Sequence, residues 1–173
     1  MSDPTPDIRI DAARLVEEYQ AGIWRYLRAL GADPPLAEDL TQETFLAVLR
    51  KPFEQYHPAA TAAYLRKVAR NLFITHQRRI NPTVQIGDLE LVETDWSRWA
   101  ATDNGDELLA ALRGCWQHVS PRAQEALNMR FRDRASRTDI AAKLELSPDG
   151  AKNLMQRAKK ALRECIERKM TSQ

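Results

Sequence analysis

Apolar residues recur every three or four positions along most of the chain, the spacing of helices that bury one side. Polar and proline-containing breaks divide this pattern into segments. It predicts helices over residues 11–30, 36–49, 63–79, 107–119, 121–131, 136–144 and 148–169. The predicted fold class is therefore all-α. Two helix starts are marked by Ser120-Pro121 and Ser147-Pro148, because serine caps a helix and proline suits its first position.

The helix predicted over residues 63–79 has one apolar side and one cationic side. Its apolar stripe consists of Leu65, Val68, Ala69 and Leu72. The rest of its surface carries no acid and holds Arg66, Lys67, Arg70, Asn71, Gln77, Arg78 and Arg79, with Tyr64, Phe73 and Ile74 among them. Phosphates bind Lys and Arg, and unpaired bases stack on flat side chains, so this helix suits a nucleic-acid strand. A solvated basic face on a bundle helix is the alternative.

The helix over residues 36–49 places acids and leucines on one arc. At about 100° per residue, that arc holds Glu38, Asp39, Gln42, Glu43, Leu46 and Leu49. Acids mixed with leucines make a poor surface for water and a good surface for another protein. The alternative is that the leucines pack on a neighbouring helix.

The last third of the chain has the pattern of a helix-turn-helix. Ser136 caps a short helix, with Asp139 at the position of a capping-box acid, and a longer basic helix follows Ser147-Pro148. The preceding helix, 121–131, is expected to turn Phe131 towards the core. The leading face of the long helix holds Lys152, Asn153, Gln156 and Arg157. These side chain types bond base edges or phosphates, whereas a helical hairpin with a solvated basic face is the alternative.

Charge is strongly segregated although the net charge is only +2. Residues 64–79 hold five bases and no acid, residues 80–107 hold seven acids and one base, and residues 130–173 hold twelve bases and six acids. Two cationic surfaces joined by an acidic segment suggest a nucleic-acid-binding protein. We therefore expect a helical domain over residues 1–80, an acidic linker over 81–106 with at most one helical turn, and a helix-turn-helix domain over 107–173.

The remaining composition narrows the function further. No membrane-spanning run or leader is visible, so a cytoplasmic protein is expected. Cys115 and Cys165 have no CxxC partner and are expected to be buried, reduced thiols. No clustered metal ligands, nucleophile–base pair or phosphate-binding glycine loop is present, so no metal, no cofactor and no enzyme activity are expected.

Three segments resemble the bacterial RNA polymerase sigma factors of the extracytoplasmic-function class, the compact two-domain form of the sigma-70 family. AEDLTQETF at 37–45 resembles that family's segment for binding the core polymerase. AYLRKVARNL at 63–72 resembles its promoter-melting helix. SRTDIAAKLELSPDGAKNLMQRAKKAL at 136–162 resembles its terminal helix-turn-helix.

The resemblance implies a factor that directs core RNA polymerase to promoters and opens the strands. Its partners would be core RNA polymerase, promoter DNA and an anti-sigma factor, without insertion into a membrane. Core binding would use Glu38, Asp39, Gln42, Glu43 and Leu46. The −10 element would meet Tyr64, Lys67, Arg70, Asn71, Arg78 and Arg79, with the loop at 51–61 closing the pocket for an unstacked base. The −35 element would meet Lys152, Asn153, Gln156 and Arg157.

Four positions depart from the family pattern. Tyr64 stands in place of a frequent Trp, and Thr75 in place of a frequent Asp. Glu145 occupies the usual Gly of the turn, which predicts a strained or altered turn. Leu154 replaces a frequent Arg and removes a phosphate contact. The alternative function is a stand-alone helix-turn-helix regulator that binds duplex DNA, which would need neither the acidic-apolar face nor the strand-binding helix.

Overall fold

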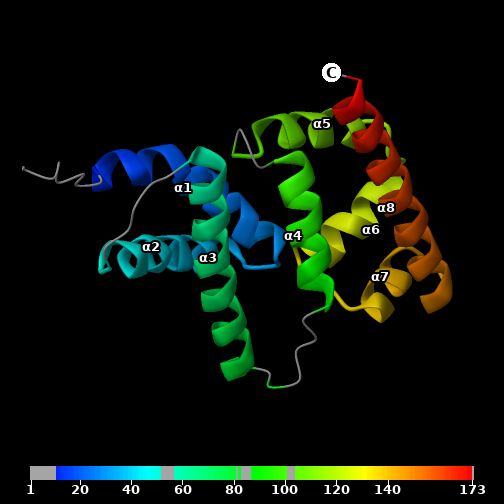
Figure 1. The fold of residues 1–173 in the computed structure, drawn as a ribbon. Helices are drawn as coiled ribbons and strands as arrows, with labels where there is room; N and C mark the ends of the chain where they lie inside the picture. The colour runs from blue at the N-terminus through cyan, green and yellow to red at the C-terminus, as the bar shows by residue number, and fades with distance from the viewer. Residues whose placement is uncertain (1–10, 52–56, 81, 83–86, 101–103, 173) are drawn as a thin grey trace, which may run out of the picture. The chain divides into compact units, whose positions relative to one another are not determined.

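The described residues form helices and short connections. The computed structural model describes residues 11–51, 57–80, 82, 87–100 and 104–172, and the all-α prediction is confirmed for them. The helices, labelled in Figure 1, are α1 (Ala12–Ala29), α2 (Pro34–Leu49), α3 (Pro58–Ile80), α4 (Gly87–Trp99), α5 (Asp106–Trp116), α6 (Pro121–Phe131), α7 (Arg137–Lys143) and α8 (Pro148–Thr171). None of the described helices combines the length and apolar character needed to cross a membrane.

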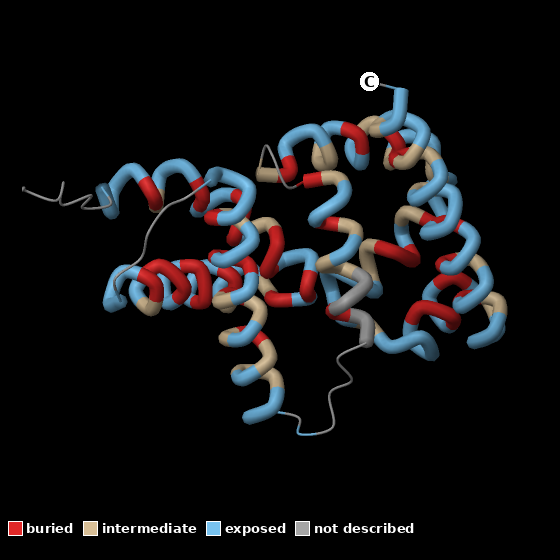
Figure 2. The backbone as a smooth tube through the Cα atoms, in the orientation of Figure 1, coloured by how far each residue is buried: buried red, intermediate tan, exposed pale blue. Residues whose placement is uncertain are grey.

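The chain divides into two compact units, Met1–Asp106 and Glu107–Gln173, and each has its own buried interior. Figure 2 shows the buried positions as stripes along the helices, with exposed surface on the other sides. Amphipathic helices of this kind become stable only when the stripes of neighbours meet.

In the first unit, α1, α2 and α3 pack around large side chains that are almost fully buried, including Leu15, Tyr26 and Leu65. Both helix starts are capped by aspartate: the Asp11 carboxylate accepts from the amides at the start of α1, and the Asp33 carboxylate accepts from the Leu36 amide in α2. Burying Thr41 and Thr44 of α2 costs little folding free energy, because both hydroxyls keep a hydrogen bond. They donate to backbone carbonyls one turn earlier, at 2.6 and 2.7 Å. Helix α3 starts at Pro58, inside the loop expected over 51–61, whose residues 52–56 lie outside the described part.

Helix α4 differs from the predicted acidic linker. A helix runs from Gly87 to Trp99, where at most one helical turn was expected. Its Leu89 and Trp96 are buried, and Trp96 meets the Tyr26 ring edge-on at 5.6 Å between centroids. The sequence did not predict this helix because its apolar residues show weak helical periodicity among many acids, and a buried partner such as Tyr26 lies far away in the chain.

The segment after α4 also belongs to the first unit. The Asn104 side-chain amide donates to the Glu18 carbonyl at 2.8 Å, and the Arg25 guanidinium pairs with the Asp106 carboxylate at 2.5 Å. Gly22 makes this approach possible, since a Cβ there would collide with the Asn104 side chain. The described part of the expected linker is therefore mostly packed structure.

In the second unit, α6, α7 and α8 share one core of small and branched residues, among them Ala126, Ile140 and Ala151. The predicted helix starts are confirmed here too. Ser120 and Ser147 cap α6 and α8, each followed by proline. Ser136 and Asp139 form the complete capping box of α7.

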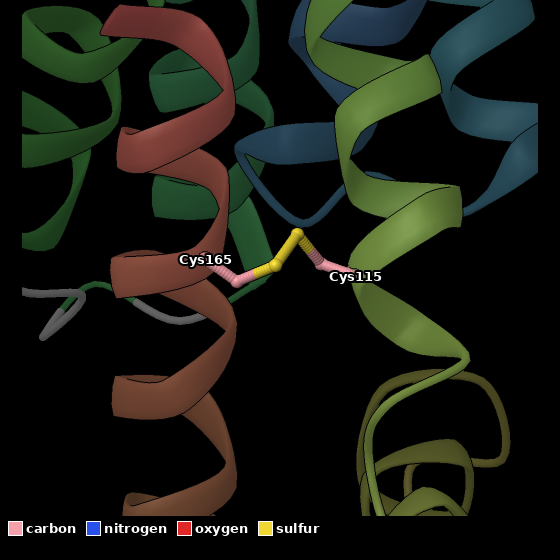
Figure 3. Close-up of a disulfide and its surroundings, with 2 residues drawn as sticks. All are labelled: Cys115 and Cys165. Atoms are coloured by element: carbon pink, nitrogen blue, oxygen red, sulfur yellow. A yellow bond between two sulfur atoms is a disulfide. The ribbon is translucent and has the colours of Figure 1, made fainter. Parts of the chain in front are cut away.

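The cysteine prediction is wrong. Cys115 on α5 and Cys165 on α8 form a disulfide whose Cα atoms lie 5.9 Å apart (Figure 3). The two residues are 50 positions apart, and they meet because α8 returns to the side of α5. Sequence spacing contains no sign of that return, which is why the pairing was not foreseen.

The turn of the helix-turn-helix keeps the shape that glycine normally provides. Glu145 has a φ of 53°, in the left-handed region. The amide of Leu146 donates to the Ala141 carbonyl at 2.8 Å, and that of Glu145 donates to the Ala142 carbonyl at 3.3 Å. These two bonds form a Schellman cap at the end of α7, so the turn is strained and not reshaped.

Glu145→Gly should stabilise the chain by about 0.5–1 kcal/mol. A left-handed residue with a Cβ costs about 1–2 kcal/mol, and the greater freedom of glycine in the unfolded chain offsets part of that gain. Urea unfolding of the full oxidised chain measures the change. Glu145→Ala is the matched control, because it removes the carboxylate but keeps the Cβ, and it should bring no gain. Equal stabilisation by both substitutions would show that charge, not backbone strain, is responsible.

Candidate nucleic-acid interface

The first three turns of α8 present an uncovered polar surface. Ala151, Met155 and Ala158 are buried, and this stripe fixes the rotation of the helix about its axis. Leu154 is partly buried against the same core, and the other side chains between them are exposed and make no hydrogen bond or ion pair with another described residue. This recognition face consists of Lys152, Asn153, Gln156 and Arg157. Its amides and cations keep their full capacity to bond base edges or phosphates.

The second half of α8 is different, because its charges are partly matched along the helix. Lys160 lies 3.9 Å from Glu164, and Arg163 lies 3.4 Å from Glu167, both at the i,i+4 spacing. Such exposed pairs contribute little to stability, but they reduce the positive potential locally. The bases of α8 that are not matched in this way lie towards its two ends: Lys152, Arg157 and Lys159 before the paired stretch, and Arg168 and Lys169 in the last turn.

A cationic hollow of about 440 Å³ borders the recognition face. Lys152 and Gln156 belong to both, and the other cations lining it are Arg130, Arg137 and Lys159. Phe131 stands at this hollow with 65% of its surface exposed, so its expected core position is wrong. Helix α6 ends at Phe131, which lines the hollow and does not enter the core. The basic run RFRDRASR at 130–137 was the signal in the sequence that could have pointed to this hollow.

On α3, most of the predicted strand-binding residues share one exposed face. Lys67, Asn71, Arg78 and Arg79 are exposed, and Tyr64 is 40% exposed. Tyr64, Lys67, Asn71 and Arg78 fall within about 60° of one another around the helix axis. From Tyr64 to Arg78 this row extends roughly 21 Å at about 1.5 Å per residue, enough for several nucleotides.

Two arginines of α3 do not join that row. Arg66, expected on the cationic surface, is only 4% exposed, and its guanidinium bonds Glu93 at 3.4 Å and Ser97 at 3.3 Å, both on α4. Arg70, predicted to meet the −10 element, is half-buried, with its Nε enclosed and without a hydrogen-bond partner among the described residues. Phe73 is buried as well, which corrects its expected exposure. Helix α4 therefore covers part of the surface expected to be cationic.

The Glu93 carboxylate connects three helices. It accepts from the Tyr26 hydroxyl of α1 at 2.5 Å and from Arg66 of α3. Burial, and then the hydrogen bond to Glu93 and its negative charge, raise the pKa of Tyr26 well above its usual value. Tyr26 is therefore a constant hydrogen-bond donor at any physiological pH, and the cluster is structural.

The predicted docking face of α2 is exposed along its whole length. Glu38, Asp39, Gln42 and Glu43 are exposed, and Leu46 and Leu49 have 56% and 39% of their surface in solvent. The alternative that these leucines pack on a neighbouring helix is wrong for the described chain. Large apolar side chains among acids are typical of a surface that another protein covers.

Comparison with known proteins gives two family matches, one in each unit. The family model for sigma-70 region 2 matches residues 15–82, and the one for sigma-70, region 4 matches residues 109–162. The "ECF RNA polymerase sigma factor BldN" of Streptomyces coelicolor is 28% identical over 152 residues, covering 86% of this chain and 58% of BldN. The "ECF RNA polymerase sigma factor SigM" of Bacillus subtilis is 24% identical over 149 residues, covering 86% of this chain and 91% of SigM.

The chain thus spans less than two thirds of BldN and nearly all of SigM. A solved structure of an RsbN–BldN complex is also similar, with 24% sequence identity and a TM-score of 0.33, covering 88% of this chain and 89% of that chain.

Proposed function

Because this chain belongs to the sigma-70 family of RNA polymerase sigma factors, in its extracytoplasmic-function class, we propose that it binds core RNA polymerase and directs it to promoters. The observation that carries the proposal is that each family match contains an exposed surface suited to the role of that region. The region 2 match contains the exposed rows of α2 and α3, and the region 4 match contains the recognition face of α8. The protein then acts in the cytoplasm, and an anti-sigma factor is its regulatory partner.

In this role the recognition face of α8 enters the major groove of the −35 element. Asn153 and Gln156 supply amides that bond adenine through two atoms, and Lys152 and Arg157 supply donors for guanine or phosphate. The adjoining hollow, with Arg130 and Arg137, holds one phosphate backbone beside the groove. This placement leaves the second half of α8 outside the groove, consistent with its internally matched charges.

The exposed row of α3 holds the separated −10 strand. The Tyr64 ring stacks on an unpaired base, the Asn71 amide bonds its edge, and Lys67, Arg78 and Arg79 bind phosphates along the row. Arg70 contributes through its partly exposed guanidinium. The α2 face (Glu38, Asp39, Gln42, Glu43 and Leu46) docks on the core polymerase. A stand-alone helix-turn-helix regulator does not need that face. A test of the α2 face therefore distinguishes a sigma factor from such a regulator.

Leu46→Glu should weaken binding to purified core polymerase at least about tenfold, because it puts a charge at the apolar centre of the docking face. Abortive initiation with core polymerase and a library of promoters measures the functional loss, and size-exclusion chromatography measures the complex. Leu46 is exposed, so the fold and binding to duplex DNA should be unchanged. Full abortive synthesis by the variant would exclude the α2 face, and no synthesis by the unaltered chain on any promoter would favour the stand-alone regulator.

Asn153→Ala and Gln156→Ala should each lose on the order of 1–3 kcal/mol of discrimination between −35 sequences. Competition binding of the holoenzyme to promoters with single base changes, chosen from a randomised −35 library, measures this. Lys160→Ala is the matched control on the same helix, because Lys160 is paired with Glu164 and lies beyond the recognition face. If both amide variants weaken all promoters equally, the residues do not read bases.

Tyr64→Ala and Asn71→Ala should impair strand opening more than closed-complex binding. Stacking of a base on an aromatic ring contributes about 1–3 kcal/mol, so the open complex should become about 5- to 150-fold less populated. Permanganate reactivity of −10 thymines in the holoenzyme complex is the measurement. Tyr64→Phe keeps the ring and should open DNA normally. Normal opening by both alanine variants would remove α3 from this role.

A further inference from the structure

The disulfide joins α5 to the second half of α8, away from the main core of the second unit. Cys115 is 1% exposed and lies in a small cluster with Ala111 and Ile166 as its other buried members. The core shared by α6, α7 and α8 is separate and contains neither cysteine among its buried residues. The bond therefore secures a peripheral helix and not the centre of the unit.

Apart from the disulfide and the Arg25–Asp106 pair at its first residue, α5 is held mainly at its end. Trp116 and Val119 pack against the main core, and the Gln124 side chain donates to the Trp116 carbonyl at 2.8 Å. The earlier turns of α5 depend on the small cluster, to which Leu108 adds a partly buried contact. Elements with so little buried apolar surface open locally at low free-energy cost. Without the bond, residues 108–114 of α5 would depend on this small cluster alone and would open more easily.

The bond can also be reached from solvent. Both cysteines line a groove of about 530 Å³, and Cys165 is only half-buried. Arg157 and Arg168 line the same groove. Guanidinium groups attract an incoming thiolate and stabilise the thiolates produced, which favours exchange at this site.

We infer that Cys115 and Cys165 form a thiol–disulfide switch that controls the attachment of α5 to α8. A thiolate of a dithiol reductant attacks the Cys165 sulfur, which forms a mixed disulfide and releases Cys115 as a thiolate that takes a proton from water. The second thiol of the reductant, as a thiolate, then attacks the reductant sulfur that is bonded to Cys165. This closes the disulfide of the reductant and releases Cys165 as a thiolate. Two electrons pass from the dithiol to the pair, and a disulfide oxidant reverses the reaction.

Reduction frees the first turns of α5 and removes one wall of the groove. The apolar side of α8 around Leu162 and Ile166 then loses its cover. Because Arg157 lies on the same groove, the change takes place beside the recognition face of α8. The switch itself does not rest on the promoter role, and its test needs no DNA.

Hydrogen exchange of the full chain, with and without dithiothreitol, tests the inference. Alkylation of free thiols, followed by mass measurement, first establishes whether dithiothreitol reduces the disulfide while the chain is still folded. Reduction should accelerate amide exchange over residues 108–114 at least tenfold and leave residues 121–158 unchanged. The double variant Cys115→Ser, Cys165→Ser should exchange like the reduced chain in both conditions.

Three outcomes would overturn the inference. The pair could resist dithiothreitol until the chain is denatured, exchange over 108–114 could stay the same after reduction, or exchange could accelerate equally across the whole unit. The first would make the bond inert, the second would make it irrelevant to α5, and the third would make it a general stabiliser. The dithiothreitol-treated natural chain decides among them even where the double variant does not fold.

Discussion

A long helix in a small domain can bury only one stripe of its surface, and both units of this protein depend on that constraint. In α3 the stripe contains Leu65, Ala69 and Phe73, and in α8 it contains Ala151, Met155 and Ala158. Once the stripe is packed, the helix cannot rotate about its axis without exposing apolar surface. The exposed polar side chains are therefore oriented by residues that never touch a partner.

Features that follow from neighbours in sequence could be predicted. The Ser caps, the capping box, the faces of α2 and α8 and the exposed row of α3 all depend on spacings of three or four residues, which the sequence displays directly. The turn at Glu145 was also foreseen as a problem, since only glycine adopts a left-handed conformation without cost.

Features that depend on distant partners could not be predicted. Arg66 is buried because Glu93, 27 residues later, comes back to meet it. Phe131, at the end of α6, is exposed at a hollow that it shares with residues of α7 and α8, and the disulfide joins residues 50 positions apart. In each case the local pattern was compatible with both outcomes. The same holds for the acidic segment, which supplies counter-charges within the first unit: Glu93 to Arg66 and Asp106 to Arg25.

The pairing of Lys160 with Glu164 and of Arg163 with Glu167 affects the thermodynamics of DNA binding through counterions. Each phosphate that a free cation neutralises releases condensed salt ions, and this release makes affinity fall with rising salt, by about 0.9 logarithmic units per contact. Cations already matched within the helix add little to that release. The affinity of the second unit for duplex DNA should therefore depend less steeply on salt than the seven Lys and Arg residues between positions 152 and 169 would indicate. Contacts to the DNA bases then supply a larger share of the binding free energy.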